Sequence, residues 1–233
     1  MRRLACFVLL MVAAVQPARA DITAEYRLWG VIGPVFKVEV ANNGNARVQL
    51  RHGTAVIRRD GILYHVQRDA DGAFLIPNPD FTAYHRRITA EAGAPDLPAL
   101  PDAALEIIEL GTEKVGGRTG MVLGVSERGR TLPEAERNEM RPFAVVISQD
   151  RDLAPVGPLV NGVFGAEIAG ALPGAADVMG RMREIYQRGT PIRIAWFLML
   201  ERTSNRAIPA EAFDLPGPVL TGEQAERRLR RKR

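Results

Sequence analysis

A strict alternation of polar and apolar residues near the start of the chain constrains the fold most. Ala46, Val48 and Leu50 are apolar and are separated by charged or polar residues, and Phe36–Val40 alternates in the same way. A two-residue period is typical of an antiparallel sheet with one face against a core and the other in water. The sequence therefore predicts antiparallel β-structure from Ile22 to about Ile76.

Short turn signals divide this stretch into strands. Asn43-Gly44 and Asp60-Gly61 each lie between two runs of strand-forming residues, and Asp71-Gly72 precedes a third run. Asn-Gly and Asp-Gly favour type I′ hairpin turns, because both central residues of that turn need a positive φ. The sequence therefore predicts a meander of five or six strands, each joined to the next.

The rest of the chain mixes helices and strands, which together with the meander predicts an α+β fold. Its apolar spacing predicts the following elements: a helix from Asp80 to about Ala92, strands Leu105–Leu110 and Thr119–Val125, a helix from Pro133, a strand Phe143–Ser148, an amphipathic helix Ala175–Arg188 and one apolar strand Pro191–Leu200.

The N-terminus has the three parts of a secretory signal peptide. Arg2 and Arg3 are followed by an apolar run, Leu4–Val15, and by the small-x-small site Ala18–Ala20. The apolar run is too short for a transmembrane span of about 20 residues. We therefore expect residues 1–20 to be removed, residues 21–222 to form a single domain, and the mature protein to be periplasmic and soluble.

Removal of the signal changes the composition. The only cysteine, Cys6, leaves with it, so the mature chain holds neither disulfides nor thiol chemistry. Without the three arginines of the signal, 28 basic residues remain against 27 acidic ones. Six of the basic residues lie in the last eleven positions, so the body is slightly acidic, which argues against a nucleic-acid-binding protein.

The basic C-terminal tail, residues 223–233, allows two interpretations. It is a disordered end in the first. In the second, its positive charge attracts anionic lipid headgroups. The candidate residues for membrane attraction are Arg227, Arg228, Arg230, Arg231, Lys232 and Arg233.

The sequence contains none of the common catalytic or cofactor-binding motifs. There is no nucleophile elbow, zinc-protease helix, phosphate-binding loop or dinucleotide fingerprint. The three histidines, His52, His65 and His85, fall in separate expected elements, and we interpret them as ordinary surface or half-buried residues. We therefore predict no catalytic residue, no metal site, no cofactor and no enzyme activity.

Several segments together resemble a group of bacterial secreted proteins related to the LolA/LolB periplasmic lipoprotein carriers. They are Ala24–Trp29, Arg47–Arg51, Val56–Tyr64, Leu110–Leu123, Gly189–Arg193 and Ile208–Pro216. The resemblance covers most of residues 21–216. It implies a strongly curved antiparallel sheet, a half-barrel closed by helices, whose hollow takes up acyl chains in the carrier proteins.

Apolar residues on the expected concave face are the candidate ligand contacts. They are Trp29, Phe36, Val38, Leu50, Trp196 and Leu198. The alternative is that these side chains simply fill the core, because one inward face serves both purposes. The Gly-rich segment Val156–Leu172 is likewise either a mobile flap over the hollow or a loop followed by a buried helix.

These observations predict a monomeric, periplasmic, non-enzymatic protein that binds an apolar or lipidated ligand in the concave face of its sheet. A structural or interaction protein of the cell envelope, docking a partner protein through its sheet face or basic tail, is the alternative. A hydrolase is the third class, and it would need a Ser or His cluster in a cleft.

Overall fold

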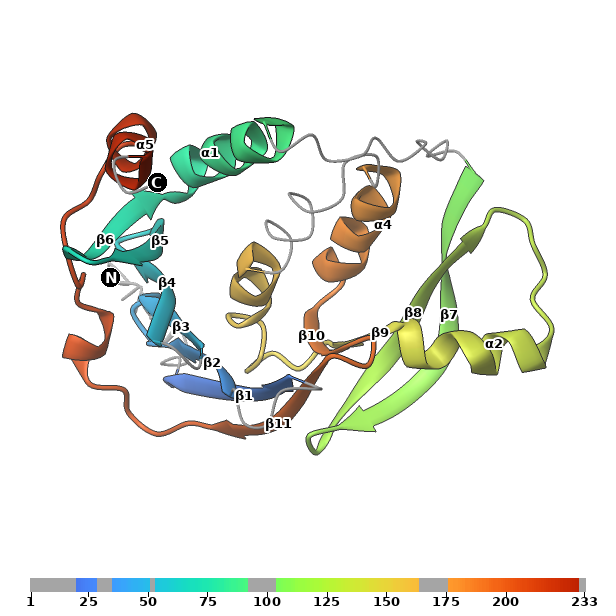
Figure 1. Cartoon of the computed structure of the whole chain (residues 1–233). Helices are drawn as coiled ribbons and strands as arrows, with labels where there is room; N and C mark the ends of the chain where they lie inside the picture. Colours follow the sequence, from blue (N-terminus) through green and yellow to red (C-terminus); the bar gives the residue numbers. More distant parts are fainter. Residues whose placement is uncertain (1–19, 29–34, 51–52, 92–103, 164–175, 231–233) are drawn as a thin grey trace, which may run out of the picture.

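The computed structural model describes residues 20–28, 35–50, 53–91, 104–163 and 176–230, which form one large antiparallel sheet with helices against it (Figure 1). Its strands are β1 Ile22–Leu28, β2 Val35–Val40, β3 Ala46–Leu50, β4 Gly53–Arg59, β5 Ile62–Asp69, β6 Gly72–Pro77, β7 Leu105–Val115, β8 Arg118–Glu127, β9 Val145–Ser148, β10 Thr190–Ile194 and β11 Leu198–Ser204. Its helices are α1 Asn78–Glu91, α2 Glu134–Met140, α4 Ala176–Gln187 and α5 Gly222–Arg230, with the 3-10 turns η2 Arg141–Phe143 and η3 Ala210–Phe213. The predicted α+β class is confirmed.

Two runs of neighbouring strands make up the sheet. Its order is β6-β5-β4-β3-β2-β1-β11-β10-β9-β8-β7, so the first six strands form one run and the last five form the other. The runs meet where β1 pairs with β11, with Ala24 opposite Thr203 and Leu28 opposite Leu198. The sheet curves around the helices but does not close on itself, because β6 and β7 lie at its two ends (Figure 1).

The predicted meander is confirmed, with six strands between Ile22 and Pro77. Asp60 and Gly61 both have positive φ, 52° and 80°, as the type I′ prediction requires. At Asn43-Gly44 only Gly44 has a positive φ, 87°, and the Ala41 amide donates to the Asn45 carbonyl at 2.8 Å. The hairpin is therefore present, but its turn is longer than the predicted one.

The single apolar strand predicted over Pro191–Leu200 is wrong. The chain reverses at residues 195–197, and the two halves become the antiparallel strands β10 and β11. Ala195 takes a positive φ of 45°, which a residue other than glycine rarely adopts. The turn contains no Gly, Pro, Asn or Asp, so the usual sequence signals of a reversal are missing.

Helices fill the hollow of the curved sheet (Figure 1). Residues 157–163 are helical, and Leu159, Val160 and Ile185 of α4 are fully buried in the same core as strand residues such as Phe36. Of the two interpretations of Val156–Leu172, the buried helix therefore holds for the part up to residue 163. The remainder, residues 164–172, lies outside the described residues.

The segment after β11 runs back across the outer face of the first strands as a strap, residues 205–221. Arg59 Nη1 lies 3.2 Å from the carboxylate of Asp214, and the Leu220 amide donates to the Leu75 carbonyl at 2.8 Å. At Gly217 an added Cβ would lie 2.0 Å from the carbonyl oxygen of Ala73, so only glycine fits there. The strap thus covers part of the sheet that the alternation alone would leave in water.

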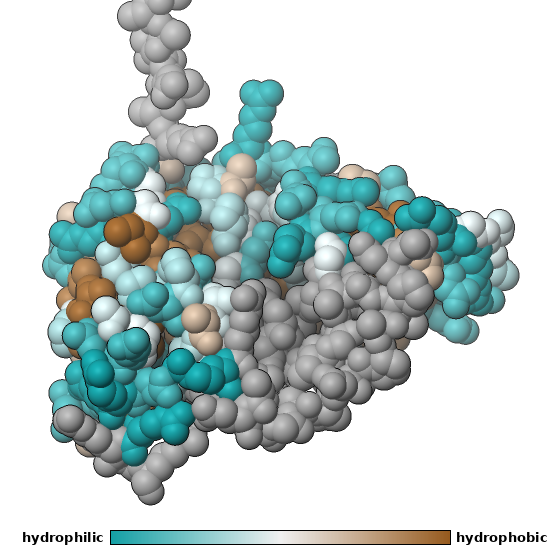
Figure 2. All heavy atoms as spheres, turned by 90° about the horizontal axis from the view of Figure 1, so that it is seen from above, coloured by the Kyte–Doolittle hydropathy of each residue, from teal (hydrophilic) through white to brown (hydrophobic). Residues whose placement is uncertain are grey.

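The C-terminal end, expected to be disordered, forms helix α5 over residues 222–230. Ala225 is fully buried against α1 and β6, and Arg228 makes a double hydrogen bond to Asp69 and lies over the ring of Phe74. The side of the molecule that carries α5 and β6 otherwise exposes mainly hydrophilic residues with small apolar patches (Figure 2). Asp69, the partner of Arg228, lies 159 positions earlier in the chain, and a local sequence pattern gives no sign of this contact.

Tyr26 ties the two runs of strands together from the inside. Its side chain is fully buried in β1, its hydroxyl donates to the Pro191 carbonyl of β10 at 3.0 Å, and its ring packs edge-on against Phe36. Burial raises the pKa of the Tyr26 hydroxyl, so it stays protonated and keeps donating this hydrogen bond.

Replacing Tyr26 by Phe should lower the free energy of unfolding by about 1–3 kcal/mol, because a buried carbonyl loses its donor. Urea unfolding measures the change. Tyr64→Phe is the matched control, since Tyr64 is half-buried and its hydroxyl has no hydrogen-bond partner among the described residues. An equal loss in both variants would show that the Tyr26 hydrogen bond contributes nothing.

Glu39 connects the outer face of the sheet to the strap. Although it lies on the outward side of β2, it is only 5% exposed. Its carboxylate lies 2.6 Å from Lys37 Nζ and accepts a hydrogen bond from Arg47, which also donates to the Ala212 carbonyl of η3 at 3.1 Å. Burial alone would raise the pKa of Glu39, but the two hydrogen bonds outweigh it and lower the pKa.

A carboxylate with a lowered folded-state pKa stabilises the protein above its unfolded pKa, about 4.3 for Glu, and the stabilisation disappears as the pH falls through the folded value. Glu39→Gln should therefore lose on the order of 1–3 kcal/mol of unfolding free energy at pH 7, and the difference from wild type should shrink at acidic pH. The exposed strap residue Glu211 provides the control variant Glu211→Gln. A deficit independent of pH would contradict this assignment.

Candidate functional site

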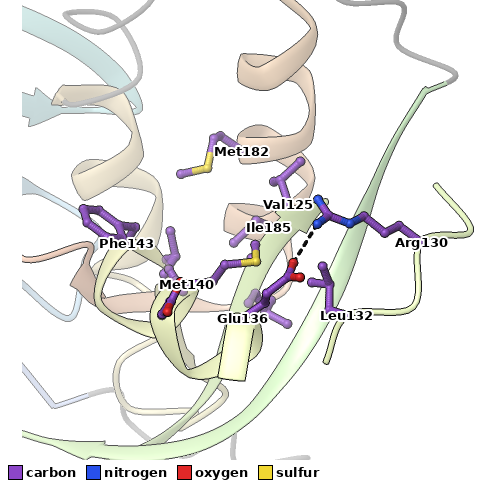
Figure 3. Close-up of a pocket in the computed structure, with 13 residues that line it drawn as sticks. Val125, Arg130, Leu132, Glu136, Met140, Phe143, Met182 and Ile185 are labelled. Atoms are coloured by element: carbon purple, nitrogen blue, oxygen red, sulfur yellow. Dashed lines mark hydrogen bonds and ion pairs between the residues drawn. The ribbon is translucent and has the colours of Figure 1, made fainter. Parts of the chain in front are cut away.

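A cavity of about 570 Å³ lies between α2 and α4, against β8 and β9 (Figure 3). Its wall combines residues from the β8–β9 connection with residues of α4. The lining residues are Leu123, Gly124, Val125, Arg130, Leu132, Glu136, Glu139, Met140, Phe143, Ala144, Val145, Met182 and Ile185.

The wall of this cavity is mostly apolar. Met182 and Ile185 lie one helical turn apart on α4, so both side chains face the sheet. Met140 ends α2, and Phe143 follows it at one side of the cavity, opposite Arg130 (Figure 3). Ile185 is fully buried, whereas Phe143 is 70% exposed, so the wall extends from the core to the surface. Methionine suits such a site because its flexible thioether adapts to ligands of different shape.

The polar residues of the cavity lie at its rim. Arg130 Nη2 is 2.7 Å from the Glu136 carboxylate, and the two side chains are 50% and 42% exposed. An ion pair this exposed contributes little to stability, because water screens both charges. The rim pair can therefore open at small cost.

Two arginines fix α2 over the cavity, although no residue of α2 is buried. The β7–β8 pairing is interrupted between Glu109 and Thr112, which frees backbone carbonyls in β7. Arg137 donates to the Glu109 carbonyl at 2.7 Å, and Arg141 donates to the Thr112 carbonyl at 3.0 Å. The position of α2 thus depends on these side-chain hydrogen bonds together with the packing of Met140 against the core.

Arg193 of β10 joins η2, the turn that ends at Phe143, to the turn between β10 and β11. It is 6% exposed, and its guanidinium donates to the carbonyls of Arg141, Pro142 and Ala195 at 2.8, 3.1 and 2.9 Å. It also lies 3.0 Å from the Glu113 carboxylate. The Ala195 amide donates to the Ala144 carbonyl at 3.0 Å, so backbone and side-chain bonds join the two turns.

Neither a metal-binding group nor a described histidine lies at this cavity. Within the described ranges, no group of three or more His, Cys, Asp or Glu side chains is placed so that it could hold a metal ion. His65 stacks on Phe81, with ring centroids 3.7 Å apart, and its Nε2 lies 2.8 Å from Asn78 Oδ1, far from the cavity wall in sequence and fold. His52 and the His85 side chain lie outside the described part. No helix within the described ranges is long and apolar enough to cross a membrane.

The residues predicted to contact a ligand lie elsewhere. Phe36, Val38 and Leu198 are fully buried in the core, Leu50 packs against that core, and Trp196 is 49% exposed on the turn between β10 and β11. None of these five lines the cavity, and Trp29 lies outside the described residues. Their role in ligand binding stays a prediction.

Sequence reasoning missed the cavity residues themselves. The apolar spacing of α4 predicts an amphipathic helix, but this pattern does not indicate which of its apolar residues line a cavity. The α2 segment looked polar, and the contribution of Met140 and Phe143 depends on how α2 folds over β8.

The basic residues proposed for membrane attraction differ in their surroundings. Arg227 is exposed, Arg228 binds Asp69, and Arg230 pairs with Glu226 at 2.8 Å. Arg231, Lys232 and Arg233 lie outside the described residues. Membrane attraction by this end stays a prediction, and Arg228 is already engaged within the fold.

Comparisons with known proteins assign this chain to no family. No family model matches the chain, and no curated protein matches it. Among solved structures it is similar to a crystal structure of MucB, with a TM-score of 0.32 and 15% sequence identity. The match covers 86% of this chain and 58% of the MucB chain. At this TM-score and sequence identity, the likeness to MucB carries no argument about the fold class or the function of this chain.

Proposed function

We propose that this chain is an exported, non-enzymatic binding protein that holds an apolar or lipidated ligand in the cavity between α2 and α4. The observation that carries the proposal is the cavity itself, about 570 Å³ with a mostly apolar wall and one exposed ion pair at its rim. Small-molecule sites are typically of this size and lined mainly by apolar side chains with few polar groups. The signal-like N-terminus supports export to the periplasm, and the carrier-like segments of the sequence support an acyl-chain ligand.

An envelope protein that docks a partner protein is the second candidate, and one observation favours it. Phe36 lies in a filled core, while Phe143 and Trp196 are exposed, as expected for an interaction surface. The two candidates differ in what the cavity does: an interaction protein needs no ligand there.

Binding of a fluorescent alkyl probe should depend on the two methionines of the cavity. Met140→Gln combined with Met182→Gln keeps the side-chain length but adds polar groups, so the dissociation constant should rise at least about tenfold. Met199→Gln is the control, because Met199 is also half-buried but does not line the cavity. Equal binding by the double variant and the control would exclude this cavity as the site.

Affinity should also depend on the length of the ligand chain. Each buried methylene contributes about 0.8 kcal/mol, which lowers the dissociation constant about fourfold. Calorimetry with fatty acids of increasing length should show this trend until the chain outgrows the cavity. A dissociation constant independent of chain length would contradict an apolar site.

A further inference from the structure

Two aromatic side chains protrude from neighbouring turns at the edge of the cavity. Phe143 is 70% exposed and Trp196 is 49% exposed, the two highest values among the described large apolar residues. Burying such side chains in water-free surroundings is favourable, and exposing them is costly unless another surface covers them. Here Phe143 and Trp196 are called the aromatic edge.

Hydrogen bonds join the backbones of the two turns that carry the aromatic edge. The buried guanidinium of Arg193 binds carbonyls on both turns, and the Ala195 amide binds the Ala144 carbonyl directly. Ala195 takes a φ of 45°, which places Trp196 at the tip of its turn. A backbone that is already fixed loses little conformational entropy when the side chains on it enter a bilayer, so this arrangement favours insertion.

We propose that the aromatic edge inserts into the surface of a lipid bilayer, which is the source of the ligand. This inference rests on the proposed function and identifies the bilayer as the place from which the ligand enters the cavity. Phe143 belongs both to the aromatic edge and to the cavity wall, so a bilayer in contact with the edge lies next to the cavity. An acyl chain could then pass between them without crossing water.

A bilayer fits the aromatic edge better than a protein partner does. A stable protein interface needs about 800 Å² on each side with matched shape, whereas the exposed apolar groups here are two side chains on turn tips. A fluid lipid surface needs no matched shape. Tryptophan is enriched at the membrane interface, where its largely apolar ring lies at the level of the headgroups.

Vesicle flotation tests the proposal with protein that starts at Asp21, just before the first strand. Vesicles are made of phosphatidylcholine, with and without phosphatidylglycerol. The test variant combines Phe143→Ser with Trp196→Ser. The control combines Ile62→Ser with Val219→Ser, because these residues are 48% and 45% exposed but lie far from the cavity. Circular dichroism confirms that both variants are folded.

The wild type and the control should bind neutral vesicles, and the test variant should bind at least about tenfold more weakly. Three results would overturn the proposal: no binding by wild type, equal binding by test and control variants, or binding only to phosphatidylglycerol that salt removes. The last result would assign the attraction to the basic C-terminal end, and the first would favour a protein partner.

Trp196→Ser alone separates this proposal from the proposed function. Trp196 does not line the cavity, so this variant should bind a soluble alkyl probe as wild type does while its vesicle binding falls. If the wild type fails to bind the soluble probe, the ligand site is refuted. Vesicle binding by the aromatic edge is then judged from the flotation result alone. Loss of probe binding in Trp196→Ser would contradict the separation of membrane contact from ligand binding.

Discussion

The pairing of β1 with β11 is the contact on which the rest of the structure depends. It joins residues near the two ends of the chain, Thr23 with Ser204 and Leu28 with Leu198, and turns two runs of hairpins into one sheet. Tyr26 reinforces the junction through its hydrogen bond to Pro191. Without this junction the two runs would have no common curvature, and α4 would have no hollow to fill.

The local parts of the fold follow from the sequence, and the non-local parts do not. Alternation predicts β2 and β3, and the Asp60-Gly61 pair predicts its turn, because these signals act between neighbouring residues. The return of β11 to β1 leaves no local signal. The reversal at Ala195 also lacks one, since the surrounding contacts impose a backbone conformation that alanine does not favour.

The same distinction explains the candidate site. The concave face where Phe36 and Val38 were expected to meet a ligand is filled by residues 157–163 and α4. The candidate cavity lies where α2, a helix without buried residues, is bound to the backbone of β7 by Arg137 and Arg141. The size of this cavity depends on how far α2 and α4 lie from each other and from the sheet. The amino-acid pattern alone does not determine those distances. In the proposed function, α2 and α4 form the two walls between which an acyl chain lies.

Photo-crosslinking with a fatty acid that carries a diazirine near the end of its chain tests the central claim most directly. After irradiation and proteolysis, mass spectrometry locates the modified residues. The account predicts labels on the residues around Met140 and Met182, displaced by excess unlabelled fatty acid. Labels confined to other surfaces, or no displaceable label, would contradict a ligand site between α2 and α4.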